Sequence, residues 1–167
     1  MRYVIATIVT LLLAGAVFAA GPHPALAADG ACTVSQAHAA VHSAQRAVAR
    51  AKVQLRKAHD IEDATRAVSI QYGGGVGRWV RLARQVGWPW AQIPSLGRCI
   101  SGESGGNPSN SNGICRGLMQ IHQCHASAFR SVTGLPYFNG VYQPQANLRF
   151  GLHLWREEGW APWVVMW

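Results

Sequence analysis

The glycine-rich segment 73–77 most constrains how this chain can fold, because it separates two halves of different composition. Four of its five residues are glycine, which favours a hinge or linker. The half before it is rich in alanine and has no tryptophan, whereas all seven tryptophans follow it. We therefore predict an Ala-rich part over residues 28–72 and a second domain over residues 78–167, joined by a linker over 73–77.

The first 27 residues have the pattern of an export signal. Arg2 precedes a nearly unbroken apolar stretch from Tyr3 to Ala20, and Ala25-Leu26-Ala27 is the small-x-small pattern that signal peptidase cuts. We predict a signal peptide over residues 1–27, with an uncleaved membrane anchor as the alternative. The mature protein is then secreted and free of stable membrane insertion, or tethered by this one segment if it is not cut.

The charge balance indicates acidic partners for a folded protein. The chain is 49% hydrophobic and 13% charged, with a formal net charge of +8, so it is too apolar for a disordered segment. An exported basic protein can meet cell-wall polymers, anionic lipids or free nucleic acid. The basic residues show no aromatic–basic pattern typical of nucleic-acid readers, so we expect no nucleic-acid partner.

Residues 33–72 predict a helical hairpin. Thr33 to Gln36 form a capping box, and Asp60 is expected to cap a shorter second helix. A seven-residue repeat between them predicts an apolar seam whose partner the sequence leaves open. The repeat places Val34, Val41, Val48 and Leu55 in one row and Ala37, Ala44, Ala51 and Ala58 in the other. The basic residues on the outer face are Arg46, Arg50, Lys52, Arg56 and Lys57.

The second domain is predicted to be helical with a small extended part. Helices are expected over 78–85, over 94–103 after Pro94, and from Pro144 to Glu158, where Gly159 stops the last one. The Gly/Asn/Ser-rich segment 105–113 predicts a loop, and 118–122 a short strand.

The four cysteines predict two disulfides, since an even count in an exported chain is typical of oxidised pairs. Three pairings are possible, of which we favour Cys115–Cys124 and Cys32–Cys99. His122 and His125 lie near these cysteines, but the spacings match no zinc or haem pattern. We expect no metal and no cofactor.

Glu103 is the one acid between Asp63 and Glu157. Its spacing from Leu96 and Ile100 places it on the apolar stripe of its predicted helix, at the C-terminal end where the helix dipole disfavours an anion. Both effects raise the pKa of the carboxyl, as a general acid near neutral pH requires. A helix-end glutamate that points to solvent is the alternative.

Two motifs in order resemble the signature of the lysozyme-like lytic transglycosylases of the SLT type. Residues 103–108 read Glu-Ser-Gly-Gly-Asn-Pro, and residues 117–121 read Gly-Leu-Met-Gln-Ile. The resemblance spans roughly residues 93–163. It implies a mainly α, α+β lysozyme-like fold: a helical catalytic domain with a small β-hairpin, here preceded by the Ala-rich helical hairpin.

The resemblance also implies roles for individual residues. Glu103 would be the catalytic acid/base, with Ser104 supporting its position and Gln120 near the cleaved bond. Met119 would line the cleft or fill the core behind it, and the same holds for Ile121.

Aromatic residues suit sugar binding because they stack on pyranose rings. Tyr137, Phe138 and Tyr142 fall in a predicted loop, and we place a cleft-lining aromatic at Tyr142. Trp160 and Trp163 belong to an ending like that of actinobacterial members of the superfamily, where we expect them to close the core. The downstream motif of Ala-Tyr-Asn-Ala-Gly type is absent, and Asn147 cannot be mapped onto it.

A single acid implies a particular reaction on peptidoglycan glycan strands. Ordinary glycoside hydrolases use two carboxylates, whereas one glutamate can cleave the MurNAc–GlcNAc β-1,4 bond if the substrate closes a 1,6-anhydro ring. A muramidase is the alternative if Glu157 or Glu158 reaches the cleft. A non-catalytic, cationic cell-wall-binding protein is the alternative from another class.

Overall fold

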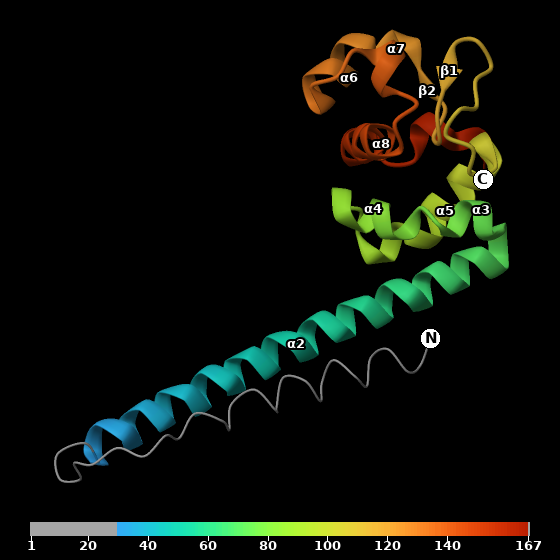
Figure 1. Cartoon of the computed structure of the whole chain (residues 1–167). Coiled ribbons are helices and arrows are strands. Elements are labelled where there is room, and N and C mark those ends of the chain that lie inside the picture. Colours follow the sequence, from blue (N-terminus) through green and yellow to red (C-terminus); the bar gives the residue numbers. More distant parts are fainter. Residues whose placement is uncertain (1–29, 167) are drawn as a thin grey trace. The chain divides into compact units, whose positions relative to one another are not determined.

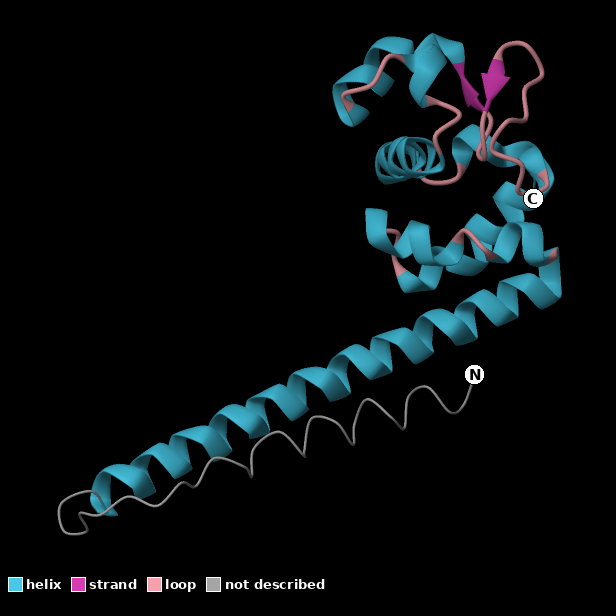
Figure 2. Cartoon of the chain, viewed as in Figure 1, coloured by secondary structure: helices cyan, strands magenta, loops and turns pink. Residues whose placement is uncertain are grey.

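The structure, a computed structural model, describes residues 30–166 and the side chains of residues 34–163. It is mainly helical with one small two-stranded antiparallel sheet, as the sequence predicted (Figures 1 and 2). The chain divides into two units, residues 1–48 and residues 49–167. The predicted signal peptide lies outside the described residues.

The Ala-rich segment forms one long helix, α2 (Gly30–Tyr72), so the predicted hairpin is wrong (Figure 1). No glycine or proline occurs between residues 31 and 72, and Asp60 lies within the helix instead of capping a second one. A capping residue is only a preference, and it starts a new helix where the preceding helix also has a stop signal. Every described residue from 34 to 57 is exposed.

The glycine-rich segment is folded rather than a linker. Gly73 takes a left-handed conformation (φ 89°) and its N–H donates to the Ser69 carbonyl, which ends α2. The next residues form the short helix α3 (Gly74–Gly77), in which Val76 is buried in the core. Gly77 packs so closely on Thr65 and Ser69 of α2 that a Cβ would not fit. Gly77 therefore allows close packing here, and the segment is part of the fold instead of a hinge.

The remaining helices confirm part of the prediction. Both α5 (Ile93–Ser104) and α8 (Pro144–Glu158) have proline in the first turn, and Gly105 and Gly159 end them with positive φ. The predicted helix over 78–85 is confirmed in outline as α4 (Val80–Val86). Elements that the sequence did not predict are α6 (Ala126–Thr133), α7 (Tyr137–Gly140) and the 3₁₀ turns η1 (Trp90–Gln92), η2 (Gln123–His125) and η3 (Ala161–Met166).

The sheet is a minimal hairpin. Strand β1 (Cys115–Arg116) pairs antiparallel with β2 (Ile121–His122), with Cys115 opposite His122 (Figure 2). Residues 117–120 form the turn between them. The strand expected over 118–122 is therefore confined to its last two residues.

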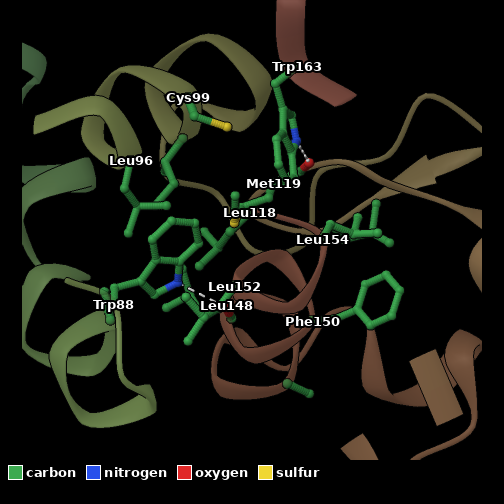
Figure 3. Close-up of a cluster of buried hydrophobic side chains, with 14 of the residues drawn as sticks. Trp88, Leu96, Cys99, Leu118, Met119, Leu148, Phe150, Leu152, Leu154 and Trp163 are labelled. Carbon is green, nitrogen blue, oxygen red and sulfur yellow. Dashed lines mark hydrogen bonds between the residues drawn. The ribbon is translucent and has the colours of Figure 1, made fainter. Parts of the chain in front are cut away.

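The core of the second unit is built around α8, against which α4 and α6 pack. Trp88 is fully buried and its indole N–H donates to the Leu148 carbonyl at 3.0 Å (Figure 3). Its ring stacks on Trp160 with centroids 5.6 Å apart. Phe150 extends the cluster toward Phe129 of α6, at 5.2 Å between ring centroids. These contacts hold α6 and the segments around Trp88 and Trp160 against α8.

The cysteines do not form the predicted Cys115–Cys124 bridge in this structure. Cys99, Cys115 and Cys124 are free thiols, and Cys99 is completely buried in the core. Cys32, the other half of the second predicted bridge, lies outside the described side chains. Within residues 30–166, no helix is long and apolar enough to cross a membrane.

Candidate functional site

A cavity of about 220 Å³ lies between the end of α5, the hairpin and η3. It gathers five kinds of functional group at one place: a carboxylate, an amide, imidazoles, a thiol and an indole. The lining residues are Glu103, Cys115, Gln120, Ile121, His122, His125, Leu154, Pro162 and Trp163. The structure therefore brings together two of the predicted site residues, Glu103 and Gln120.

Glu103 lies in the last turn of α5, half-buried at the wall of the cavity. Burial raises the pKa of its carboxyl above the ordinary value of a glutamate, as the apolar stripe predicted. Its backbone carbonyl accepts a hydrogen bond from Asn110 Nδ2 at 3.0 Å, which holds the loop 105–113 against the helix end. Glu103 thus has the environment of a carboxyl that stays protonated above its usual range.

Glu103 is also the one carboxylate among the described residues that line the cavity. Glu157 lies on α8 beside His153, at 3.4 Å, and is exposed, as is Glu158. Neither belongs to the cavity lining. The second acid that simple hydrolysis would use is therefore missing from the described lining.

Ser104 ties the helix that carries Glu103 to the hairpin. Its hydroxyl lies 2.8 Å from the Leu118 carbonyl and 3.2 Å from the Ile100 carbonyl, and it accepts from the Gly106 N–H at 3.2 Å. Ser104 does not line the cavity. Its geometry fits the supporting role that the sequence assigned to it and does not fit direct contact with a ligand.

Gln120 has a strained backbone, with φ 45°, the one positive value among the described non-glycine residues. Its side-chain Nε2 donates to the carbonyls of Asn110 at 3.0 Å and Gly117 at 2.9 Å. Since these two bonds use both amide protons, the group that Gln120 can offer to a ligand is the acceptor Oε1.

The Asn147 side chain fixes the hairpin turn by hydrogen bonds to its backbone, a role that the sequence did not reveal. It is fully buried in α8; its Oδ1 accepts from the Met119 N–H at 3.0 Å, and its Nδ2 donates to the carbonyls of Val141 at 2.9 Å and Arg116 at 3.2 Å. The sequence did carry a signal, because Asn147 stands three and seven residues before Phe150 and Leu154, on the apolar side of the predicted helix. Buried polar side chains need partners, and here they are backbone groups next to Gln120.

Two predicted ligand-binding residues do not line the cavity. Met119 is fully buried and lies against Gly151 of α8, so it belongs to the core, which was the other reading of this residue. Tyr142 is half-buried and packs against the core. Tyr137, which we placed in a loop, begins α7 and donates its hydroxyl proton to the Ile121 carbonyl at 2.6 Å. Of these aromatics, Phe138 is the most exposed, at 62%.

The tryptophans of the C-terminal segment close the core, as expected. Trp163 is buried, and its indole N–H donates to the Met119 carbonyl at 2.9 Å, directly before Gln120 (Figure 3). Trp160 packs on Trp163 with ring centroids 5.6 Å apart. One edge of Trp163 also reaches the cavity wall, so this residue joins the core to the candidate site.

Sequence reasoning missed the imidazoles and the thiol at the site. His122 Nδ1 accepts from the Cys124 N–H at 3.0 Å, which leaves Nε2 for a ligand, and His125 packs on the Phe150 ring. Burial raises the pKa of the Cys115 thiol. The sequence placed Cys115 in a disulfide, and the spacings of the two histidines matched no metal pattern. Among the described residues, no group of three His, Cys, Asp or Glu is arranged to hold an ion.

Comparison with known proteins gives no relative: no family model matches the chain, and neither a curated protein nor a solved structure is significantly similar to it. The geometry of the cavity and the two sequence motifs therefore stand on their own.

Proposed function

We propose that this protein is a peptidoglycan lytic transglycosylase that cleaves the MurNAc–GlcNAc β-1,4 bond with Glu103 as its general acid and base. The observation that carries the proposal is the lone, half-buried carboxyl of Glu103, with its raised pKa, at the wall of a polar cavity. The order and spacing of the two motifs, residues 103–108 and 117–121, supports the same assignment.

In the first step the protonated Glu103 carboxyl gives its proton to the glycosidic oxygen, and the bond to C1 of the muramic residue breaks. The positive charge that develops at C1 is stabilised by the N-acetyl oxygen of the same sugar. No second protein carboxylate is required for this step, which fits the described lining of the cavity.

In the second step the Glu103 carboxylate takes the proton of the muramic C6 hydroxyl while the oxygen of that hydroxyl bonds to C1. The product is a 1,6-anhydro ring, and Glu103 is again protonated. No water is consumed and no cofactor takes part. The raised pKa serves both steps, because the group must hold a proton at the start and recover one at the end.

Gln120 is proposed to orient the sugar through the acceptor Oε1, which can receive the N–H of the N-acetyl group. Its side chain is fixed by bonds to Asn110 and Gly117, so the acceptor is held in place before the substrate binds. Ser104 and Asn147 act through the backbone and position the two sides of the cavity.

The proposed place of action is the cell wall outside the membrane. It follows from the predicted signal peptide and from the basic charge, which suits an anionic wall. Peptidoglycan strands are the proposed partner, without stable membrane insertion and without nucleic acid.

The test is a digest of purified peptidoglycan analysed by mass spectrometry, with the wild-type protein beside Glu103→Gln and the matched control Glu158→Gln. We expect muropeptides lighter by one water, a loss of about 10²–10⁴-fold in rate for Glu103→Gln, and unchanged activity for Glu158→Gln. Products with reducing ends would identify a muramidase. Binding without cleavage, the same for wild type and Glu103→Gln, would identify a wall-binding protein, and both results would overturn the proposal.

A further inference from the structure

Helix α2 carries an apolar face that the rest of the described chain leaves uncovered. We call residues 34–58 the arm; all but Ala58 are exposed. Its large apolar side chains are about half exposed: Val34 57%, Val41 54%, Val48 53% and Leu55 53%. Buried core residues begin only at Val68, beyond the arm. A helix with this much exposed valine and leucine gains stability when the face is covered.

The face is a continuous seam of eight residues, the four large ones and the Ala row. In a heptad frame, the large residues Val34, Val41, Val48 and Leu55 occupy position a, and Ala37, Ala44, Ala51 and Ala58 occupy position d. The seam is about 36 Å long at the usual rise of an α-helix. Apolar rows at positions a and d form the surface on which a second helix packs in a coiled coil.

The seam is complementary to itself when a second copy runs antiparallel with the two-fold axis at Arg46. Every large residue then faces an alanine of the other copy: Val34 faces Ala58, Leu55 faces Ala37, Val41 faces Ala51 and Val48 faces Ala44. Every layer pairs one large residue with one alanine, Leu–Ala where Leu55 meets Ala37 and Val–Ala elsewhere, so no layer is left with two alanines. A parallel pair would instead alternate Val–Val layers with Ala–Ala layers, which leaves gaps at each alanine layer.

The charges favour the same arrangement. The basic residues of the arm all lie between Arg46 and Lys57, and the nearest acid along the chain is Asp60. A parallel pair would hold these two basic segments side by side, within the range of electrostatic repulsion in physiological salt. In the antiparallel pair each basic segment lies beside residues 35–46 of the other copy, which carry no charge apart from Arg46 itself.

We propose that the arm is the dimerisation element of this protein, an antiparallel two-helix coiled coil formed with a second copy through the Val/Leu–Ala seam. The inference does not depend on the proposed enzymatic function, because it uses no residue of the cavity.

The test compares two substitutions of equal chemistry on different faces of the arm. Val48 is in the seam, whereas Val53 is 52% exposed at position f, outside the seam. In sedimentation velocity over a concentration series, the exported protein and Val53→Asp are expected to be dimers, and Val48→Asp a monomer. Because both sites are exposed, tryptophan fluorescence should report unchanged unfolding for all three.

Orientation is measured by double electron–electron resonance with a spin-labelled residue introduced at Arg46 or at Lys57. In the antiparallel dimer the two Arg46 positions lie at the same height along the seam, on opposite outer faces of the pair, whereas the two Lys57 positions are about 33 Å apart along the seam. A distance between the Lys57 labels no longer than that between the Arg46 labels would indicate a parallel pair and overturn the proposed register.

Three other outcomes overturn the proposal. A wild-type protein that stays monomeric at all concentrations would show that no second copy covers the seam. Mass spectrometry of its N-terminus would then say whether residues 1–29 are still present to cover it. Equal weakening by Val48→Asp and Val53→Asp would show association through another surface. Binding to an anionic wall polymer with no dimer in solution would show that the arm binds the wall through its basic residues and does not dimerise.

Discussion

The arm and helix α8 contain apolar residues in similar patterns but use them differently. Leu55 in the arm is 53% exposed, whereas Leu148 in α8 is completely buried and its carbonyl accepts a hydrogen bond from Trp88. Both lie on regular apolar stripes. A helical repeat therefore reports which side of a helix is apolar but does not report whether the same chain covers that side. At α8 neighbouring helices cover it, and in the arm we propose that a second copy does.

The largest expected effect comes from the same substitution made in both regions. Leu148→Ala should reduce the free energy of unfolding by about 2–5 kcal/mol, because it removes a buried side chain and leaves a cavity. Leu55→Ala should change it by less than about 1 kcal/mol when the protein is monomeric. Tryptophan fluorescence during chemical unfolding follows the core beyond the arm, because the arm contains no tryptophan. Equal losses would mean that the arm is part of the same core.

A second comparison concerns two glycines with positive φ in the loop after α5. A Cβ on Gly106 (φ 84°) would overlap the backbone of Gly75, whereas Gly113 (φ 98°) has open space around it. Both alanine variants strain the backbone, but Gly106→Ala also forces α3 away from the loop. We expect Gly106→Ala to be less stable than Gly113→Ala by about 2 kcal/mol in thermal unfolding. Equal losses would show that close packing of α3 contributes nothing.

The smallest expected effect is a pH dependence of stability that Glu103 causes. Its pKa is raised in the folded state, so the folded state loses stability as the pH rises from the ordinary carboxyl pKa through the raised value. Glu103→Gln should therefore match the wild type at acid pH and be more stable than the wild type at neutral pH. Chemical unfolding of both proteins at several pH values measures this difference. A wild type that is more stable than Glu103→Gln at neutral pH would contradict the prediction.

The same titration predicts how activity depends on pH. Because the acid must be protonated to act, cleavage of peptidoglycan should fall as the pH rises through the raised pKa of Glu103. A flat rate from acid to neutral pH would argue against Glu103 as the proton donor. The rate is measured by release of soluble muropeptides at constant ionic strength.

Sequence reasoning succeeded where local signals were sufficient. Pro144 and Gly159 bound α8 because proline suits a first helical turn and glycine a helix end, and the stripe of α5 revealed that Glu103 is half-buried. It failed at Asp60 and at residues 73–77, where a local preference was overruled. Asp60 had no stop signal before it, and Gly77 packs against Thr65 and Ser69 of α2, a contact that no local pattern reveals.

The candidate site was predicted only in part for a related reason. Glu103 and Gln120 were found from motifs, but His122, His125 and Cys115 reach the cavity because the hairpin and η2 turn them toward it. Such convergence depends on tertiary contacts, among them the bonds of Asn147 to the Met119 N–H and the Val141 carbonyl. A sequence read in short windows has no access to these contacts.

The left-handed backbone of Gln120 sets the stability of the hairpin turn against the proposed function of the side chain. Glycine adopts this conformation without strain, so Gln120→Gly would relieve the hairpin turn while removing the amide that bonds to Asn110 and Gly117. Under the proposed function, a laboratory selection for heat resistance alone would drift toward glycine at this position and enrich inactive protein. A selection that also demands wall cleavage would retain glutamine, so the residue that such a dual screen keeps at position 120 reports what the turn is for.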